Sequence, residues 1–200
     1  GDANLYKLSK LYLILGRTDD AIALLQALPS PSHEASLLLA QSLVKKGLIE
    51  QATELFDSIV VSCGTGRSPT GAAAALQGAR LKLAQAHPDF MGIAAQLKNL
   101  VMQKNFEGEP LYLEAALDYV DLMAKQNPGK KIELLQKTKS DFAEKVDLLS
   151  KDYHAARALS PRKDRLYQGY IKLMDAEIFT AQADMDVQNQ KELRAQAKDL

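Results

Sequence analysis

Two matching stretches of sequence indicate the fold: Gly16-Arg-Thr-Asp-Asp-Ala21 and Gly47-Leu-Ile-Glu-Gln-Ala52. Each stretch closes one amphipathic helix and opens the next. A Gly and the Ala five residues after it recur at an offset of 31 residues. A period of this size is typical of stacked helical hairpins, which bury a continuous core only by packing on their neighbours. The spacing therefore predicts a helical repeat architecture and favours a binding scaffold over an enzyme.

Apolar residues recur at helical spacing on both sides of each stretch. The helix predicted for residues 5–15 carries a stripe made by Leu5, Leu8, Leu11, Tyr12 and Leu15. Gly16 is expected to end this helix in a left-handed conformation, and Asp19 and Asp20 favour the start of the next. The second hairpin begins with Ser32 as N-cap and repeats the pattern with Leu37, Leu39, Ala40, Leu43, Ala52, Leu55, Phe56 and Ile59.

These residues resemble the tetratricopeptide repeat (TPR) family, whose unit of roughly 34 residues pairs a helix, a glycine turn and a second helix. The family pattern falls on Leu5, Leu8, Ser9, Tyr12, Gly16, Ala21 and Leu25, and again on Leu39, Ala40, Leu43, Gly47, Ala52 and Phe56. The chain departs from it in lacking Trp, in placing Ser36 where an aromatic is usual, and in a period about three residues short. The resemblance implies a TPR-like α-solenoid. A generic helical bundle is the alternative.

The following residues continue the helical pattern without the Gly and Ala signature. A helix from Pro69 and another after Asp89 make a third hairpin. A helix between Pro110 and Pro128 begins a fourth pair, since Pro favours the first position of a helix. We therefore expect TPR-like helical repeats over residues 1–127.

Residues 128–200 are expected to form a longer antiparallel hairpin that packs on or extends the solenoid. After Gly129 a heptad seam is made by Ile132, Leu135, Phe142, Val146, Leu149, Tyr153 and Ala156. One helix of about 30 residues would reach about 45 Å, and a break near 138–141 is the alternative. The helix from Pro161 carries a stripe made by Tyr167, Ile171, Met174, Ile178, Ala181 and Met185. The predicted fold class is all-α, with stacked antiparallel hairpins followed by a longer C-terminal hairpin.

The composition argues against partners that are recognised through a global electric field. Lys plus Arg and Asp plus Glu number 25 each, so we expect no nucleic-acid partner. The apolar runs are far shorter than the roughly 20 residues of a spanning helix, so we expect a soluble chain without membrane insertion. The single Cys63 favours a reducing compartment, the cytoplasm. Because the sequence starts at Gly1 without Met, we also expect a longer parent protein, and a removed signal stays an alternative.

No motif predicts catalysis, a cofactor or a metal. The stretch Gly66-Arg-Ser-Pro-Thr-Gly71 has the spacing of a phosphate-binding loop, but Ala72 and Ala73 stand where that loop needs Lys and a hydroxyl. A Gly-rich linker is favoured, and anion binding at Arg67 is the alternative. None of the three histidines has metal-ligand spacing. Cys63 is interpreted as a packed thiol rather than a nucleophile.

The first helix of each hairpin carries the candidate partner-binding residues. In the family these helices build the concave wall, so the resemblance implies that a bound peptide faces Tyr6, Lys10, Leu37, Gln41, Val44 and Lys45. Lys10 and Lys45 would meet a carboxylate, while Tyr6 and Leu37 would supply apolar area. We therefore predict a noncatalytic scaffold or adaptor that binds a peptide or helix of another protein.

Three other functions stay open at this point. The C-terminal hairpin is suited to an assembly subunit, so homo-oligomerisation is an alternative. A secretion-type chaperone would use the same groove for an unfolded client. An enzyme using the region from Cys63 to Gly71 is the third alternative.

Overall fold

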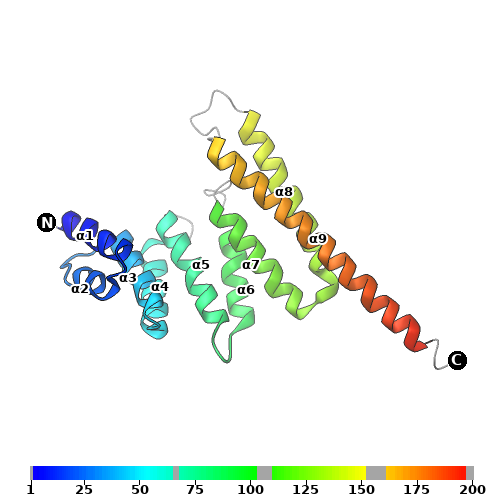
Figure 1. Cartoon of the computed structure of the whole chain (residues 1–200), viewed down its shortest axis with the longest axis horizontal. Coiled ribbons are helices and arrows are strands. Elements are labelled where there is room, and N and C mark those ends of the chain that lie inside the picture. Colours follow the sequence, from blue (N-terminus) through cyan, green and yellow to red (C-terminus); the bar gives the residue numbers. More distant parts are fainter. Residues whose placement is uncertain (1, 65–67, 103–109, 152–160, 197–200) are drawn as a thin grey trace. The chain divides into compact units, whose positions relative to one another are not determined.

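A computed structural model describes residues 2–64, 68–102, 110–151 and 161–196, which form helices and turns and contain no strand. The chain divides into two compact units, Gly1–Phe106 and Glu107–Leu200. Figure 1 shows their helices coloured along the sequence. The two units are described separately below.

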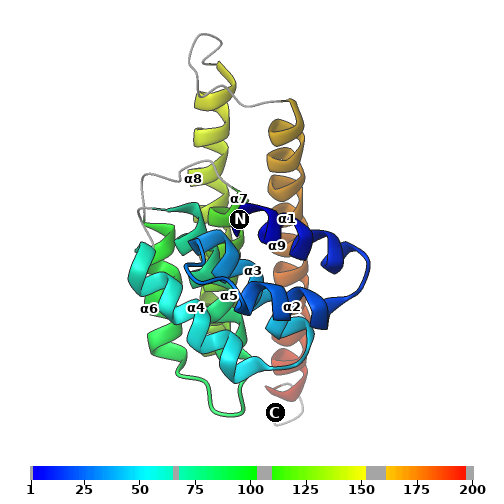
Figure 2. The same ribbon diagram turned by 90° about the vertical axis from the view of Figure 1, so that its left-hand side faces the viewer.

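Six helices in three hairpins make up the described part of the first unit. They are α1 (Asp2–Ile14), α2 (Thr18–Gln26), α3 (His33–Lys45), α4 (Ile49–Cys63), α5 (Pro69–Leu83) and α6 (Phe90–Val101). Each odd-numbered helix packs on the next one as a hairpin, and successive hairpins contact each other through α2 with α3 and through α4 with α5 (Figure 2). The helices thus pack in sequence order, as stacked repeats do.

The two glycine turns have the same conformation, as the repeat predicts. Gly16 has a φ of 75° and Gly47 a φ of 76°, both in the left-handed region that favours glycine. In both turns the amide after the glycine donates a hydrogen bond to the carbonyl five residues before it, at 2.8 and 3.0 Å. This is a Schellman-type end for α1 and α3, and it lets the chain reverse into the next helix.

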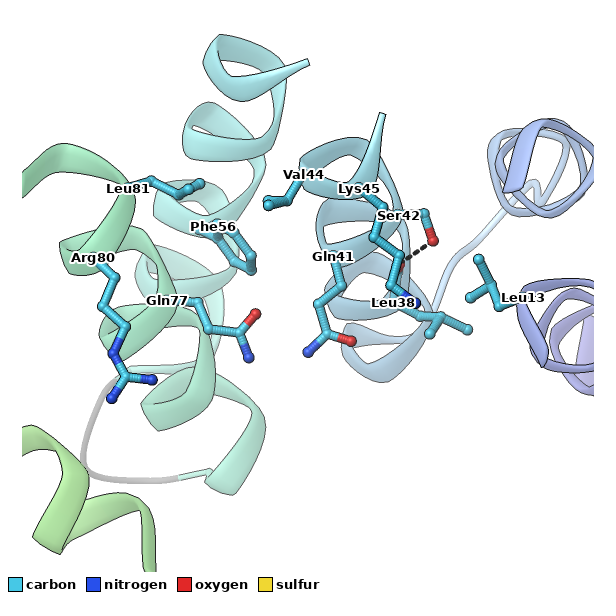
Figure 3. A pocket seen from close by; sticks show the side chains of 10 residues that line it. All are labelled: Leu13, Leu38, Gln41, Ser42, Val44, Lys45, Phe56, Gln77, Arg80 and Leu81. Atoms are coloured by element: carbon cyan, nitrogen blue, oxygen red, sulfur yellow. Dashed lines mark hydrogen bonds between the residues drawn. The ribbon is translucent and has the colours of Figure 1, made fainter. Parts of the chain in front are cut away.

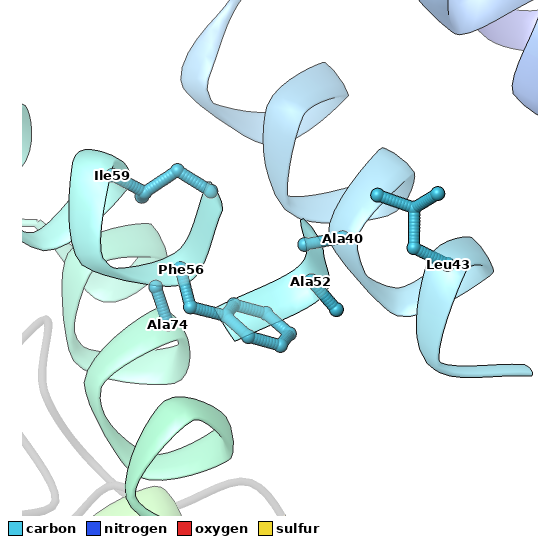
Figure 4. Packing of buried hydrophobic residues seen from close by; sticks show 6 residues of the cluster. All are labelled: Ala40, Leu43, Ala52, Phe56, Ile59 and Ala74. Carbon is cyan, nitrogen blue, oxygen red and sulfur yellow. The ribbon is translucent and has the colours of Figure 1, made fainter. Parts of the chain in front are cut away.

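Small side chains lie where the helices cross, and large ones fill the space between hairpins. Ala21 and Ala52, which match each other in the two repeats, are fully buried. Leu25 and Phe56, which match each other four residues later, are also buried. The cluster in Figure 4 joins the second hairpin to α5 and contains Ala40, Leu43, Ala52, Phe56, Ile59 and Ala74. Close crossing at alanine allows this tight packing.

The predicted apolar stripe of the first helix is wrong in part. Leu8, Leu11 and Leu15 are exposed, whereas Ser9 is fully buried. The Ser9 hydroxyl donates to the Tyr6 carbonyl at 2.8 Å, so its polar group is satisfied within the helix. Among the described helices, α1 packs mainly on α2. Of the predicted stripe, Leu5 packs against the cluster of Leu25, Leu28 and Ala35, and Ser9 shares the buried side of the helix.

Side-chain caps fix the starts of three helices. The Ser32 hydroxyl accepts a hydrogen bond from the Ala35 amide at 3.2 Å, and Asp89 accepts one from the Gly92 amide at 3.0 Å. Ser68 caps α5 in the same way. The pKa of Glu34 is lowered, first by a hydrogen bond from its own backbone amide and then by the Ser32 hydroxyl. The predicted cap at Ser32 is therefore confirmed, and Asp89 caps the helix that was expected after it.

The described part of the second unit contains α7 (Pro110–Gln126), a 3₁₀ turn η2 (Pro128–Lys130), α8 (Lys131–Lys151) and α9 (Pro161–Gln196). Helix α8 is continuous through 138–141, so the alternative of a break there is wrong. Side chains from 145 to 164 lie outside the described residues, and with them the seam positions Val146, Leu149, Tyr153 and Ala156.

Helices α8 and α9 pack as an antiparallel hairpin. Leu135 of α8, Ile178 of α9 and Val120 of α7 form one buried cluster. Lys139 forms an ion pair with Asp175, which lies on the adjacent turn of α9. Tyr167 and Met174 are also fully buried on this side of α9. The long C-terminal hairpin of the predicted fold class is therefore present.

Helix α7 belongs to the second compact unit. The units divide between 106 and 107, because α7 packs on α8 and α9 through the cluster around Val120. Pro128 ends α7 and opens only the short η2 turn before α8. A division of roles between 1–127 and 128–200 stays a prediction.

Candidate functional site

A groove lies between the first helices of the three hairpins in the first unit. Its volume is about 380 Å³. Helices α1, α3 and α5 supply its walls and α4 supplies one residue, and the full lining consists of Leu13, Leu38, Gln41, Ser42, Val44, Lys45, Phe56, Gln77, Arg80 and Leu81 (Figure 3). Protein sites for ligands typically measure about 300–1,000 Å³.

The floor of the groove is apolar. Phe56 is fully buried, and its ring lies between Val44 and Gln77 in Figure 3. Leu81 extends across the gap toward Val44. The Ser42 hydroxyl already has a hydrogen-bond partner within α3, because it donates to the Leu38 carbonyl at 2.7 Å. An apolar side chain of a bound peptide would therefore leave water and gain contacts with the carbon atoms of this floor.

The polar side chains of the groove carry only neutral or positive charge. Gln41, Gln77 and Arg80 extend toward the same side of the groove in Figure 3. Lys45 is exposed at the end of α3. None of the ten described lining residues is acidic, and two are basic. The groove thus presents amide groups and cations around an apolar floor.

The structure brings three of the six predicted partner-binding residues together. Gln41, Val44 and Lys45 line the groove. Leu37 packs against the core cluster around Phe56 and is half-buried. The other two pair with each other on α1, where the Lys10 ammonium lies 4.4 Å from the centre of the Tyr6 ring. Neither of these lines the groove.

Sequence reasoning missed the contribution of α5. Gln77, Arg80 and Leu81 are spaced by three and four residues, so they lie on one face of the helix. This spacing can be read from the sequence. The third hairpin lacks the glycine and alanine signature, so no register could be carried from α3 to α5. Phe56 was predicted only as core packing, although it also forms the groove floor.

The other candidates from the sequence are a metal site, the thiol of Cys63 and the loop before α5. Among them no group of three or more His, Cys, Asp or Glu side chains could hold a metal ion. Cys63 is a free thiol and is half-buried at the end of α4. Gly66 and Arg67 of the predicted Gly-rich linker, where anion binding was the alternative, lie outside the described residues. None of the described helices combines the length and apolar character needed to cross a membrane.

Comparison with solved structures identifies the fold. No protein-family profile and no curated protein matches the chain. A crystal structure of a point variant of TPR-like repeats from a Podosopora anserina kinesin light chain matches with a TM-score of 0.57 and 19% identity, covering 92% of this chain and 95% of that one. The fold is TPR-like. A second structure of these Podosopora anserina repeats has a TM-score of 0.54 and 16% identity, over 88% of this chain and 95% of the other.

Stacked helical hairpins form an extended surface from the first helices of successive repeats. The groove of this chain lies on that surface, between α1, α3 and α5.

Proposed function

We propose that the TPR-like repeats are a noncatalytic scaffold whose groove binds a peptide or helix of a partner protein. One observation carries the proposal: the first helices of three successive hairpins contribute to a single groove of about 380 Å³ with an apolar floor. Such a groove accepts the apolar face of a peptide, while polar groups at its edge fix the peptide's position.

The charges of the groove favour an acidic partner segment. Lys45 and Arg80 are its two charged lining residues, and both are basic. A carboxylate on the partner would form a charge-assisted hydrogen bond with Lys45. Gln41 and Gln77 can both donate to and accept from a peptide backbone. We therefore infer a short segment that combines at least one large apolar side chain with a carboxylate.

Selection from a displayed peptide library tests this function on the whole chain. Selected peptides are expected to combine apolar and acidic residues, and their affinities are measured by fluorescence anisotropy. Lys45→Glu should weaken binding by about tenfold or more, since a charged hydrogen bond contributes about 1.5–3 kcal/mol. Lys98→Glu is the matched control, because Lys98 is exposed on α6 and does not line the groove. Equal affinities in the two variants contradict the proposal.

A second variant tests the prediction made for α1. The sequence predicts that Lys10 meets a carboxylate, yet Lys10 lies over Tyr6 and does not line the groove. Lys10→Glu should therefore leave the affinity of a groove-bound peptide within about twofold, as expected of charges outside the contact. A loss as large as that of Lys45→Glu would extend the binding surface along α1.

A further inference from the structure

Helix α9 has a second apolar face on the side opposite its core contacts. Its buried residues Tyr167, Met174 and Ile178 pack toward α7 and α8. Leu166, Leu173 and Val187 are 44%, 46% and 52% exposed. They fall at one position of a heptad, in register with Thr180, and small exposed residues fill the other apolar position: Gly169, Ala176 and Ala183.

The seven positions of this second face are uncharged, and Asp184 lies at the edge of the stripe in line with Leu166. At 100° per residue, the seven positions lie within a sector of about 100° that is centred opposite the buried side. From Leu166 to Val187 the stripe is about 32 Å long. The Thr180 hydroxyl donates to the Ala176 carbonyl at 2.9 Å, so it demands no further partner. In Figure 1 the C-terminal half of α9, in orange to red, extends beyond α7 and α8.

We propose that two copies of this chain pair through the second face of α9, with the two helices antiparallel. In this arrangement three layers form, and in each a larger residue lies opposite a smaller one. Leu166 faces the partner's Ala183, Leu173 faces the partner's Ala176, and Thr180 faces the partner's Gly169. The twofold symmetry of such a dimer repeats each contact once, which doubles every favourable layer.

The side-chain volumes in the three layers favour the antiparallel arrangement over the parallel one. Parallel helices in register would place Leu173 against Leu173 but Gly169 against Gly169. Layers with two large side chains would then alternate with layers that leave a void between the helices. Alternating large and small residues across facing positions fills an interface without voids. The same alternation lets the two helix backbones approach closely along the whole stripe.

The charges beside the stripe are complementary in the same register. Arg165 lies next to the partner's Asp186, and the symmetric pair forms at the other end of the interface. Lys172 lies next to the partner's Phe179, which is exposed and offers a ring face to a cation. Each exposed charge pair contributes modestly, but a like-charged pair in its place is unfavourable. The face is thus complementary to itself in shape and charge.

The size of the stripe sets the expected strength of the dimer. A strip about 32 Å long and about 10 Å wide covers roughly 320 Å² on each helix. Stable complexes bury about 800 Å² on each partner, so this contact belongs with weak and reversible ones. We expect dissociation constants from micromolar to several hundred micromolar, with fast exchange between monomer and dimer.

Sedimentation velocity of the whole chain tests the proposal across that concentration range. The average mass should rise from 21.9 kDa toward twice that value. Ala176→Arg places a long cation in the central layer and should raise the dissociation constant at least tenfold. Gln168→Arg adds the same charge to an exposed position of α9 outside the stripe, and it should change the constant by less than threefold. A monomer at every concentration, or equal behaviour of the two variants, overturns the proposal.

A charge exchange tests the antiparallel register. Arg165→Asp would place two acidic residues together at both ends of the dimer and should weaken it about fivefold. Adding Asp186→Arg recreates the opposite pair with its signs reversed and should restore the original constant. Both variants change only exposed side chains of α9, so circular dichroism should remain that of the parent chain. Failure of the second substitution to restore dimerisation overturns the antiparallel pairing.

Discussion

Replacing Gly47 with alanine isolates the cost of the left-handed turn between α3 and α4. Gly47 has a φ of +76°, and an added methyl group would meet no described atom within 4 Å. Crowding therefore contributes nothing, and the backbone conformation alone sets the cost. A non-glycine residue in the left-handed region costs roughly 1–2 kcal/mol, partly offset by a less flexible unfolded chain. We expect the free energy of unfolding to fall by about 1 kcal/mol.

Three further variants test whether the expected loss of stability comes from the left-handed turn. Gly16→Ala should cost the same amount, because Gly16 has a φ of +75° and equally open surroundings among the described residues. Gly47→Asn should cost less, since Asn tolerates the left-handed region. Gly169→Ala should instead stabilise the chain by about 0.5–1 kcal/mol, because Gly169 lies inside α9 with no described atom near its added methyl group.

Urea unfolding followed by far-ultraviolet circular dichroism measures all four variants at low protein concentration. The two glycine turns belong to the first compact unit and Gly169 to the second, so separate transitions would shift separately. A Gly47→Ala variant as stable as the parent chain, or more stable, would refute the assignment of a left-handed turn. Unequal losses at Gly16 and Gly47 would refute their equivalence in the repeat.

Two other substitutions probe the core and a helix cap. Phe56→Ala removes a fully buried ring from the cluster between the second and third hairpins, and denaturant titration should show a loss of about 3–5 kcal/mol. Ser32→Ala removes the cap of α3 and should cost about 1 kcal/mol by the same measurement. Because the pKa of Glu34 is lowered in the folded chain, its contribution to stability is present above the unfolded value of about 4.3 and is lost as the pH falls through the folded value. NMR titration should find the pKa of Glu34 higher in Ser32→Ala, and an unchanged pKa would contradict the role of the hydroxyl.

Local rules predicted the elements where one residue type dictates the backbone. Gly16 and Gly47 have the left-handed φ that their position in the repeat requires. Ser32 and Asp89 cap helices because a short oxygen-bearing side chain can reach a free amide. Ala21 and Ala52 are buried because only a small side chain fits where two helices cross closely.

The missed features depend on which helices become neighbours, which no local pattern contains. The leucines of α1 have helical spacing, yet Leu11 and Leu15 are exposed because, among the described helices, α1 packs mainly on α2 alone. The α5 side of the groove was missed for the same reason, since its register follows from packing on α4. The second face of α9 was hidden by the stronger stripe around Met174, although its heptad spacing is present in the sequence.

Mapping a selected peptide onto the chain by NMR chemical-shift perturbation tests the proposed scaffold function most directly. We expect the largest changes at backbone amides of α3 and α5, around Gln41, Val44, Gln77 and Leu81. Lys45→Glu should reduce these changes at a fixed peptide concentration, whereas Lys98→Glu should preserve them. Changes concentrated on α2, α4 and α6, or on the second compact unit, would contradict the assignment of the groove as the binding site.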